Sequence, residues 1–297
     1  MHTLSLIDAC DITRAVKELC IEACTRLPGQ VVSLLENARQ KETFAPARET
    51  LELISKNASI ARQTGVPICQ DTGMAVVFAY VGQDVHITGG LLYDAVNEGV
   101  RQGYIDGYLR KSVVGDPVRR GNTGDNTPAI LHIRNVPGNT LRLVVSPKGF
   151  GSENMSRVAM LTPAQGLEGV KEFVIDTVRK AGSNPCPPMM LGVGIGGDFE
   201  QVAMLAKEAL VFSQPHADPY YRALEEELLA AVNALGIGPQ GFGGLTTALS
   251  LHIRTAPTHI AGLPVAVNVG CHVTRHAERI LEGLPCTLNR KEDAPCL

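Results

Sequence analysis

Three cysteines lie in loops bounded by glycine and proline, and long stretches of chain separate them. The loops read Pro-Ile-Cys-Gln-Asp-Thr-Gly at Cys69, Asn-Pro-Cys-Pro-Pro at Cys186 and Asn-Val-Gly-Cys-His at Cys271. The intervals between them are far longer than those of a zinc finger or a bacterial ferredoxin. Only a fold that returns the chain to one place three times could unite these thiols. Three thiolates without an obvious fourth predict a metal centre that keeps one position open, which indicates chemistry rather than scaffolding.

Composition excludes several classes of protein. The 297 residues carry a formal net charge of −3, only 4% aromatic residues and no Trp, which argues against binding to nucleic acid. No apolar stretch approaches the roughly 18 residues that span a bilayer, so we expect no membrane segment. The N-terminus, Met1-His2-Thr3, lacks a basic secretory start. We therefore expect a cytoplasmic protein whose eight cysteines are thiols or metal ligands rather than disulfides.

Hydrophobic periodicity predicts a mixed α/β fold in which mixed sheets are flanked by helices. We expect residues 1–297 to form a single catalytic domain, with two subdomains as an alternative. A turn at Pro137-Gly138-Asn139 predicts a hairpin between the strands on either side of it. The predicted helices cover 11–26, 31–41, 49–64, 91–108, 166–181, 200–212 and 219–235, and the predicted strands cover 74–81, 129–134, 141–146, 245–254 and 263–268.

The remaining cysteines give weaker signals. Cys20 and Cys24 lie four residues apart on one face of the first predicted helix, where they could form half a metal site. We favour buried core thiols, because free cysteine is commonly buried. The sequence assigns no role to Cys10, Cys286 or Cys296.

The run Gly192-Val-Gly-Ile-Gly-Gly197 formally satisfies the dinucleotide-binding fingerprint Gly-x-Gly-x-x-Gly. We discount this interpretation, because the helix that follows leads to prolines and another helix, so we expect no second parallel strand. A glycine turn that lets backbone approach a ligand is favoured instead.

Other polar loops carry groups capable of chemistry. Asp71 could transfer a proton while Gln70 binds a carboxylate, although Asp71 could equally cap the following turn. The Lys148–Asn154 loop could bind an anion through its amides, or could be a tight turn capped by Ser152 or Asn154. The loop Asn122–Pro128 receives no role.

Two side chains outside these loops have an ordinary explanation as well as a functional one. Arg110 could clamp a carboxylate with its guanidinium, or could be a solvated surface residue. His259 is more simply a core residue unless its loop folds over the metal centre.

Six motifs together closely resemble the cluster-binding alpha part of the iron–sulfur hydro-lyases, the class I fumarase and L-tartrate dehydratase family. The resemblance covers about Val31 to Glu278. In chain order the motifs are Cys-Gln-Asp-Thr-Gly, Gly-Asp-Asn-Thr-Pro, Lys-Gly-Phe-Gly-Ser-Glu-Asn, Cys-Pro-Pro, Gly-Ile-Gly-Pro-Gln-Gly and Pro-Thr-His-Ile-Ala.

The resemblance implies a [4Fe–4S] cluster on Cys69, Cys186 and Cys271, with the fourth iron free for substrate. It implies Asp71 as the proton-transfer group. It also implies a set of substrate contacts, namely Gln70, Arg110, His259 and the glycine loop at Gly149 or Gly151.

Single-chain members of that family carry a further C-terminal domain, and we expect none here because the chain ends at Leu297. The resemblance therefore implies the alpha subunit of a two-subunit carbon–oxygen lyase, completed by a beta subunit in an alpha dimer or an α2β2 assembly. The expected reaction converts (S)-malate to fumarate. L-Tartrate dehydratase is the nearest alternative, and a non-catalytic iron–sulfur or zinc module is the alternative of another class.

Overall fold

The computed structural model describes residues 2–288, and these form two compact units. Unit 1 takes its described residues from 2–24, 70–147 and 276–288, and unit 2 takes them from 25–69 and 148–275. Each unit is therefore discontinuous in sequence. The bond between Cys69 and Gln70 is one of the places where the chain passes from one unit to the other.

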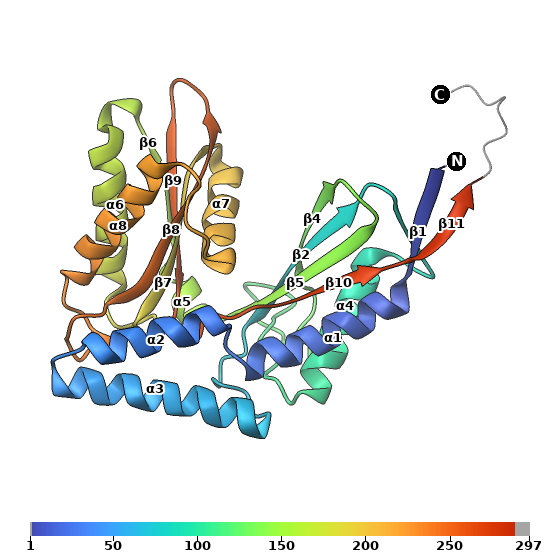
Figure 1. The fold of residues 1–297 in the computed structure, drawn as a ribbon, viewed down its shortest axis with the longest axis horizontal. Helices are drawn as coiled ribbons and strands as arrows, with labels where there is room; N and C mark the ends of the chain where they lie inside the picture. The colour runs from blue at the N-terminus through green and yellow to red at the C-terminus, as the bar shows by residue number, and fades with distance from the viewer. Residues whose placement is uncertain (1, 289–297) are drawn as a thin grey trace. The chain divides into compact units, whose positions relative to one another are not determined.

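Unit 1 combines two helices with two sheets (Figure 1). One sheet has the strand order β11-β1-β3 and the other has the order β10-β5-β2-β4. The elements are β1 (His2–Asp8), α1 (Ala9–Thr25), β2 (Met74–Gly82), β3 (Val85–Thr88), α4 (Leu92–Asp106), β4 (Ile130–Val136), β5 (Thr140–Lys148), β10 (Ala277–Glu282) and β11 (Leu284–Leu288).

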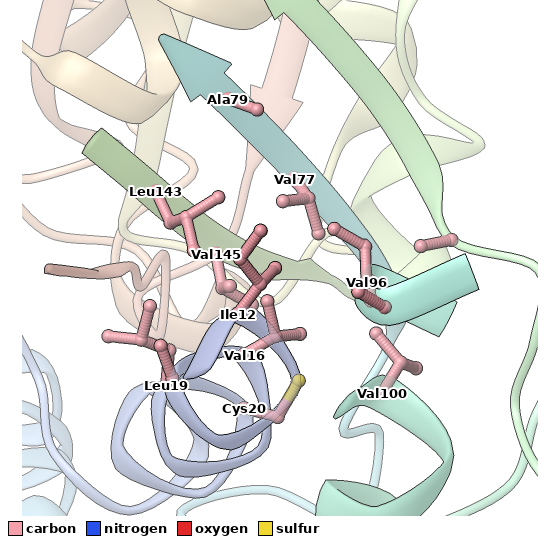
Figure 2. Packing of buried hydrophobic residues seen from close by; sticks show 14 of the residues in the cluster. Ile12, Val16, Leu19, Cys20, Val77, Ala79, Val96, Val100, Leu143 and Val145 are labelled. Carbon is pink, nitrogen blue, oxygen red and sulfur yellow. The ribbon is translucent and has the colours of Figure 1, made fainter. Parts of the chain in front are cut away.

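The core of unit 1 forms where one face of α1 packs against strands and α4. Ile12, Val16 and Leu19 recur at helical spacing and are fully buried. Figure 2 shows them beside side chains of β2, β5 and α4, with Cys20 in the same cluster. Cys20 and Cys24 are 0% and 1% exposed, which confirms the prediction of core thiols.

The predicted hairpin across Pro137–Asn139 is wrong. β2 lies between β4 and β5 in the sheet, and β2 pairs with β4 in parallel. The turn instead passes close to the end of β2, where Asp84 N donates to Gly138 O at 3.0 Å. A short polar connection between two apolar runs is compatible with a hairpin and also with two strands separated by a third. The sequence pattern alone therefore could not distinguish these topologies.

Unit 2 is built on a four-stranded sheet of order β6-β9-β7-β8 with helices on both faces (Figure 1). β8 and β7 are parallel, and β9 is antiparallel to β7. The elements are α2 (Gly29–Lys41), α3 (Ala45–Thr64), α5 (Phe150–Glu153), β6 (Arg157–Leu161), η1 (Pro163–Gln165), α6 (Gly166–Ala181), β7 (Met189–Gly197), α7 (Phe199–Phe212), α8 (Pro219–Asn233), η2 (Pro239–Gly241), β8 (Ala248–Thr258) and β9 (Leu263–Gly270).

Strand alternation explains how β7 serves both faces of this sheet. Leu191, Val193 and Ile195 pack with α6 and α8, whereas the intervening Gly192 and Gly194 face α7. A Cβ at Gly192 would lie 2.1 Å from the carbonyl oxygen of Ala206, so only glycine admits α7 this close.

The glycines of the formal dinucleotide fingerprint therefore lie within a strand rather than in a phosphate-binding turn. The structure corrects one part of the sequence argument, because β8 is a parallel partner of β7 and a β-α-β connection does exist. Among residues 2–288, no helix has both the length and the apolar character needed to cross a bilayer.

Candidate functional site

The Cys186 loop precedes β7 and is held by a second turn. Cys186 has a left-handed backbone, with φ of 55°, which is uncommon for a residue other than glycine. Its amide donates to Ser183 O at 3.1 Å. Gln240 donates both its backbone amide and its side-chain Nε2 to Pro187 O, each at 2.8 Å. The Gly-Pro-Gln-Gly motif therefore supports the loop that presents Cys186.

Cys271 follows β9 at the same end of the sheet. The backbone amide and hydroxyl of Thr274 both donate to Cys271 O, at 3.0 and 2.8 Å. His272 Nδ1 lies 2.8 Å from Cys186 O, and because a carbonyl only accepts, we assign the proton to Nδ1. This bond connects the Cys271 loop to the Cys186 loop.

Cys69 is positioned by α3. The side-chain amide of Asn57 donates to Ile68 O at 2.9 Å. Ile68 belongs to a small apolar cluster with Ala61 and Val273, and both Cys69 and Cys271 pack against that cluster. Unit 2 thus brings the three loops together.

The Cys186 thiol is influenced electrostatically by the thiols of the other two loops. Partial burial of its sulfur raises the pKa of the Cys186 thiol, and the thiols of Cys271 and Cys69 act in the same direction. Among the described residues 2–288, however, no three His, Cys, Asp or Glu side chains converge as ligands of one metal ion. The three thiols are nevertheless close enough for Cys69 and Cys271 to act on Cys186.

The glycine loop lies at the same end of unit 2 as the cysteines. Gly149 is the N-cap of α5, in place of the predicted Ser152 or Asn154, and no side chain caps this short helix. A Cβ at Gly151 would lie 3.9 Å from Asn184 O, two residues before Cys186. Backbone at Gly151 is therefore close to the Cys186 loop.

A buried charge network that the sequence reasoning missed surrounds this loop. The Lys148 ammonium lies 3.1 Å from a Glu153 carboxylate oxygen and donates to Ser152 Oγ at 2.8 Å. Glu153 also pairs with Lys207 and accepts from the Asn268 side chain at 2.7 Å.

The charges of this network shift the pKa values of both Glu153 and Lys148. Burial opposes ionisation of Glu153, but the ammonium groups of Lys148 and Lys207 outweigh it and lower the pKa of the carboxyl to about 2. Burial lowers the pKa of Lys148, an effect that Glu153 and Cys271 oppose. The charges on either side of the glycines were visible in the sequence, but only the fold shows that they pair.

Gln70, Asp71 and Arg110 belong to unit 1. The amide of Gly73 donates to Asp71 Oδ1 at 3.0 Å, which is the turn-capping geometry expected as one alternative for this carboxylate. Arg110 follows α4 and has an exposed side chain. Its backbone is joined to the Asp71 loop through the Thr72 hydroxyl, which accepts from Arg110 N at 2.8 Å.

The sheet of unit 2 separates His259 from the cysteines. His259 directly follows Thr258, which pairs with Gly197 at one end of β7, whereas Cys271 follows Gly270, which pairs with Met190 at the other end. At about 3.3 Å per residue, the two ends lie roughly 20 Å apart. His259 is exposed, and its Nδ1 accepts from the Ala261 amide at 3.2 Å.

The other cysteines lie elsewhere. Cys10 is exposed at the start of α1, and Cys286 lies in β11. Cys20 is enclosed in the core of unit 1, and burial raises the pKa of its thiol. Cys296 is outside the described residues.

Comparison with known proteins gives consistent matches along nearly the whole chain. The model of the family described as Fumarate hydratase (Fumerase) matches residues 13–280. A protein of Methanocaldococcus jannaschii, provisionally named L(+)-tartrate dehydratase subunit alpha, is 39% identical over 273 residues, which cover 90% of this chain and 96% of that one. The L(+)-tartrate dehydratase subunit alpha of Escherichia coli strain K12 is 30% identical over 287 residues, covering 93% and 94% of the two chains.

These matches include the three cysteine loops, the glycine loop and the loops that carry Asp71 and Arg110. The chain therefore belongs to the fumarate hydratase family and is a carbon–oxygen lyase.

Proposed function

We propose that the protein reversibly dehydrates a 2-hydroxy dicarboxylate, with (S)-malate and fumarate as the pair. The observation that carries this proposal is the gathering of Cys69, Cys186 and Cys271 at one end of unit 2, beside the glycine loop. The reaction breaks the C–O bond of the 2-hydroxyl, removes a proton from the adjacent carbon and releases one water. It needs help for a poor leaving group and a base for a weakly acidic proton.

We propose that the thiols of Cys69, Cys186 and Cys271 hold a [4Fe–4S] cluster rather than a single zinc ion. A zinc site draws its ligands to one point at about 2.3 Å from each sulfur, whereas a cluster distributes its thiolates over separate irons. The three neighbouring thiols supply the thiolate ligands that such a cluster uses. When bound, such a cluster would supply Lewis acidity at an iron that carries no cysteine.

Asp71 is the proposed proton-transfer group. It follows Cys69 by two residues, so the chain alone keeps the two Cα atoms within about 7 Å of each other. The Gly73 amide orients the carboxylate through Oδ1. A carboxylate held in this way could take the proton from the carbon next to the hydroxyl-bearing carbon.

Charged and amide groups are proposed to hold the two substrate carboxylates. Arg110 offers a planar guanidinium that can bind a carboxylate through two parallel hydrogen bonds. Gln70 offers a side-chain amide, Gly149 offers backbone at the start of α5, and Gly151 offers backbone close to the Cys186 loop. Such donors would also stabilise negative charge that builds up on the carboxylate as the proton leaves.

For His259 we propose a substrate contact made in a second copy of the chain. A four-carbon dicarboxylate at the cysteines cannot reach a residue at the far end of the same sheet, roughly 20 Å away. Mixing Cys69→Ser and His259→Ala proteins would then restore one intact site per mixed dimer. Failure of that mixture to regain activity would remove His259 from the proposed substrate contacts.

The relatives are named as alpha subunits, so we propose a separate beta subunit as partner, in an α2β2 assembly. A cytoplasmic location would keep the thiols reduced and available to metal. The names of the relatives also favour a second candidate substrate, L(+)-tartrate, which poses the same chemical problem and carries one more hydroxyl.

The test uses protein purified anaerobically and combined with its beta subunit. Iron and acid-labile sulfide are measured in the wild type, in Cys69→Ser and in Cys10→Ser, whose exposed thiol serves as the control. We expect Cys69→Ser alone to lose the cluster and activity. Rates on malate and on tartrate distinguish the two substrates, and zinc without sulfide in the wild type would overturn the assignment.

A further inference from the structure

The polar loop before β4 inserts one fully buried side chain, Asn126, between two functional segments of unit 1. Asn126 is 0% exposed. Its Oδ1 accepts from the Ser112 amide at 2.7 Å, and its Nδ2 donates to Gly73 O at 3.2 Å. Gly73 lies two residues after Asp71, and Ser112 lies two residues after Arg110. One side chain therefore ties the Asp71 loop to the Arg110 segment.

Thr72 makes a second tie between the same two segments. Its hydroxyl accepts from Arg110 N at 2.8 Å and donates to Arg110 O at 3.2 Å. A hydroxyl can do both at once, whereas an aliphatic side chain of the same shape can do neither. Thr72 is 2% exposed, so its hydroxyl is enclosed by protein.

Tyr104 and Cys24 bind backbone carbonyl groups of the Asp71 loop. The Tyr104 hydroxyl lies 2.9 Å from Thr72 O and 3.0 Å from Gly73 O, and it shares its one hydrogen between them. The Cys24 thiol points at Thr72 O from 3.7 Å. The Asp71 loop is thus anchored to both helices of unit 1, α1 and α4.

We propose that Thr72 and Asn126 are positioning residues that fix the Asp71 carboxylate relative to Arg110. The inference rests on the proposed function, in which Asp71 moves the proton and Arg110 holds a substrate carboxylate. Neither positioning side chain contacts substrate, because both are buried and engaged with backbone. Their role is to keep an acid–base group and a carboxylate clamp in one geometry, which is where much of the benefit of a preorganised site arises.

The first test compares Thr72→Val, which keeps the shape but removes the hydroxyl, with Thr72→Ser, which keeps the hydroxyl. Thr177→Val is the matched control, because Thr177 is likewise buried, at 0% exposed, and its hydroxyl donates to Phe173 O within α6. In the complex with the beta subunit we expect Thr72→Val to retain its iron and sulfide. Its kcat/KM should fall by on the order of 100-fold, with Thr72→Ser close to wild type. Equal losses in Thr72→Val and Thr177→Val would overturn the positioning role.

The second test is independent of activity. Amide hydrogen exchange of residues 70–73 and 108–112 is measured on the full chain, because the Arg110 amide donates to Thr72 and the Ser112 amide to Asn126. We expect faster exchange of Arg110 in Thr72→Val and of Ser112 in Asn126→Ala. Unchanged exchange would reject the inference even if the enzyme is active.

A double-mutant cycle separates positioning from a general structural effect. If Thr72 acts through Arg110, the loss from Thr72→Val should largely disappear in an Arg110→Ala background. Additive losses would reject the inference. A wild type without activity on either substrate would refute the proposed function, while the exchange experiment would still decide whether these residues hold the loop.

Discussion

Lys148 and Glu153 form an ion pair, 3.1 Å apart, that brackets the glycine loop of unit 2. The Lys148 side chain is 8% exposed and that of Glu153 is 25% exposed. The pair also reaches β9 through Asn268, whose amide donates to Glu153 at 2.7 Å and to Ser156 at 2.8 Å. Since Asn268 lies three residues before Cys271, one network connects the glycine backbone with a cysteine loop.

Replacing the central carboxylate should therefore destabilise unit 2. Glu153→Gln leaves the Lys148 ammonium buried without its counter-charge, so we expect the free energy of unfolding to fall by about 3 kcal/mol. Chemical denaturation at pH 7 measures this loss. Glu36→Gln is the control, because Glu36 pairs with Arg39 on an exposed helix surface, and it should have little effect.

The same pair predicts a dependence on pH. The pKa of Glu153 is about 2 in the folded protein against an ordinary value of 4.5, so its contribution is complete above pH 4.5 and declines as pH falls toward 2. The difference in stability between wild type and Glu153→Gln should shrink over that range. A difference that stays constant down to pH 2 would contradict the ion-pair explanation.

Asp71→Asn should separate catalysis from cluster binding. The amide keeps an oxygen for the Gly73 hydrogen bond but cannot accept the proton, so we expect full iron content and a kcat lower by about 100-fold or more. Asp116→Asn is a close control, because Asp116 also accepts from the amide two residues ahead, at 2.9 Å, and has no proposed chemistry. Near-normal kcat in Asp71→Asn would exclude it as the proton-transfer group.

Gly192→Ala should disrupt the packing of α7 on the sheet. The added methyl would lie 2.1 Å from Ala206 O and 2.4 Å from Leu210 N, both backbone atoms that cannot turn aside. We expect a loss of about 3 kcal/mol or more, seen as a lower denaturation midpoint or failure to fold. Gly29→Ala is the control, because a Cβ there meets nothing within 4 Å.

His252 should make unit 2 sensitive to mild acid. Burial lowers the pKa of its imidazole from 6.5 to about 4, and neither ring nitrogen has a hydrogen-bond partner in the described part of the chain. The neighbouring Glu225 carboxylate lies 3.9 Å from Nδ1, beyond hydrogen-bonding distance. The unfolded chain therefore binds a proton more readily than the folded one between pH 6.5 and 4, so stability falls as pH falls through that window.

The variant His252→Leu tests this explanation. It removes the titrating ring without leaving a polar atom unpaired, so the drop in unfolding free energy from pH 7 to pH 4 should shrink, by at most about 3 kcal/mol. Denaturant titrations at the two pH values measure the change. An unaltered acid dependence would assign it to groups other than His252.

Most helices and the inner strands were predictable from the sequence because their burial is local. The α6 helix begins and ends where the pattern placed it, and α1 and α4 differ from the prediction by one or two residues at each end. The missed strands β3, β6, β10 and β11 lie at sheet edges, and the missed β1 is the middle strand of a three-stranded sheet whose partners, β11 and β3, are distant in sequence. In these strands the alternation of apolar and polar residues is weak, and hydrogen bonding to strands that are distant in sequence decides that they form.

The sequence by itself determined the chemistry that is available: three cysteines in rigid loops, a carboxylate beside one of them, a glycine loop and an arginine. It determined this because residue type and turn composition are local properties of the chain. The tertiary structure alone decided which of these groups meet. It gathered the three thiols and the glycine loop, and it placed His259 at the opposite end of the sheet. It also buried Lys148 against Glu153, and it tied Asp71 to Arg110 through Thr72 and Asn126. Each of these relationships depends on packing between segments of the folded chain, which residue type and turn composition do not specify.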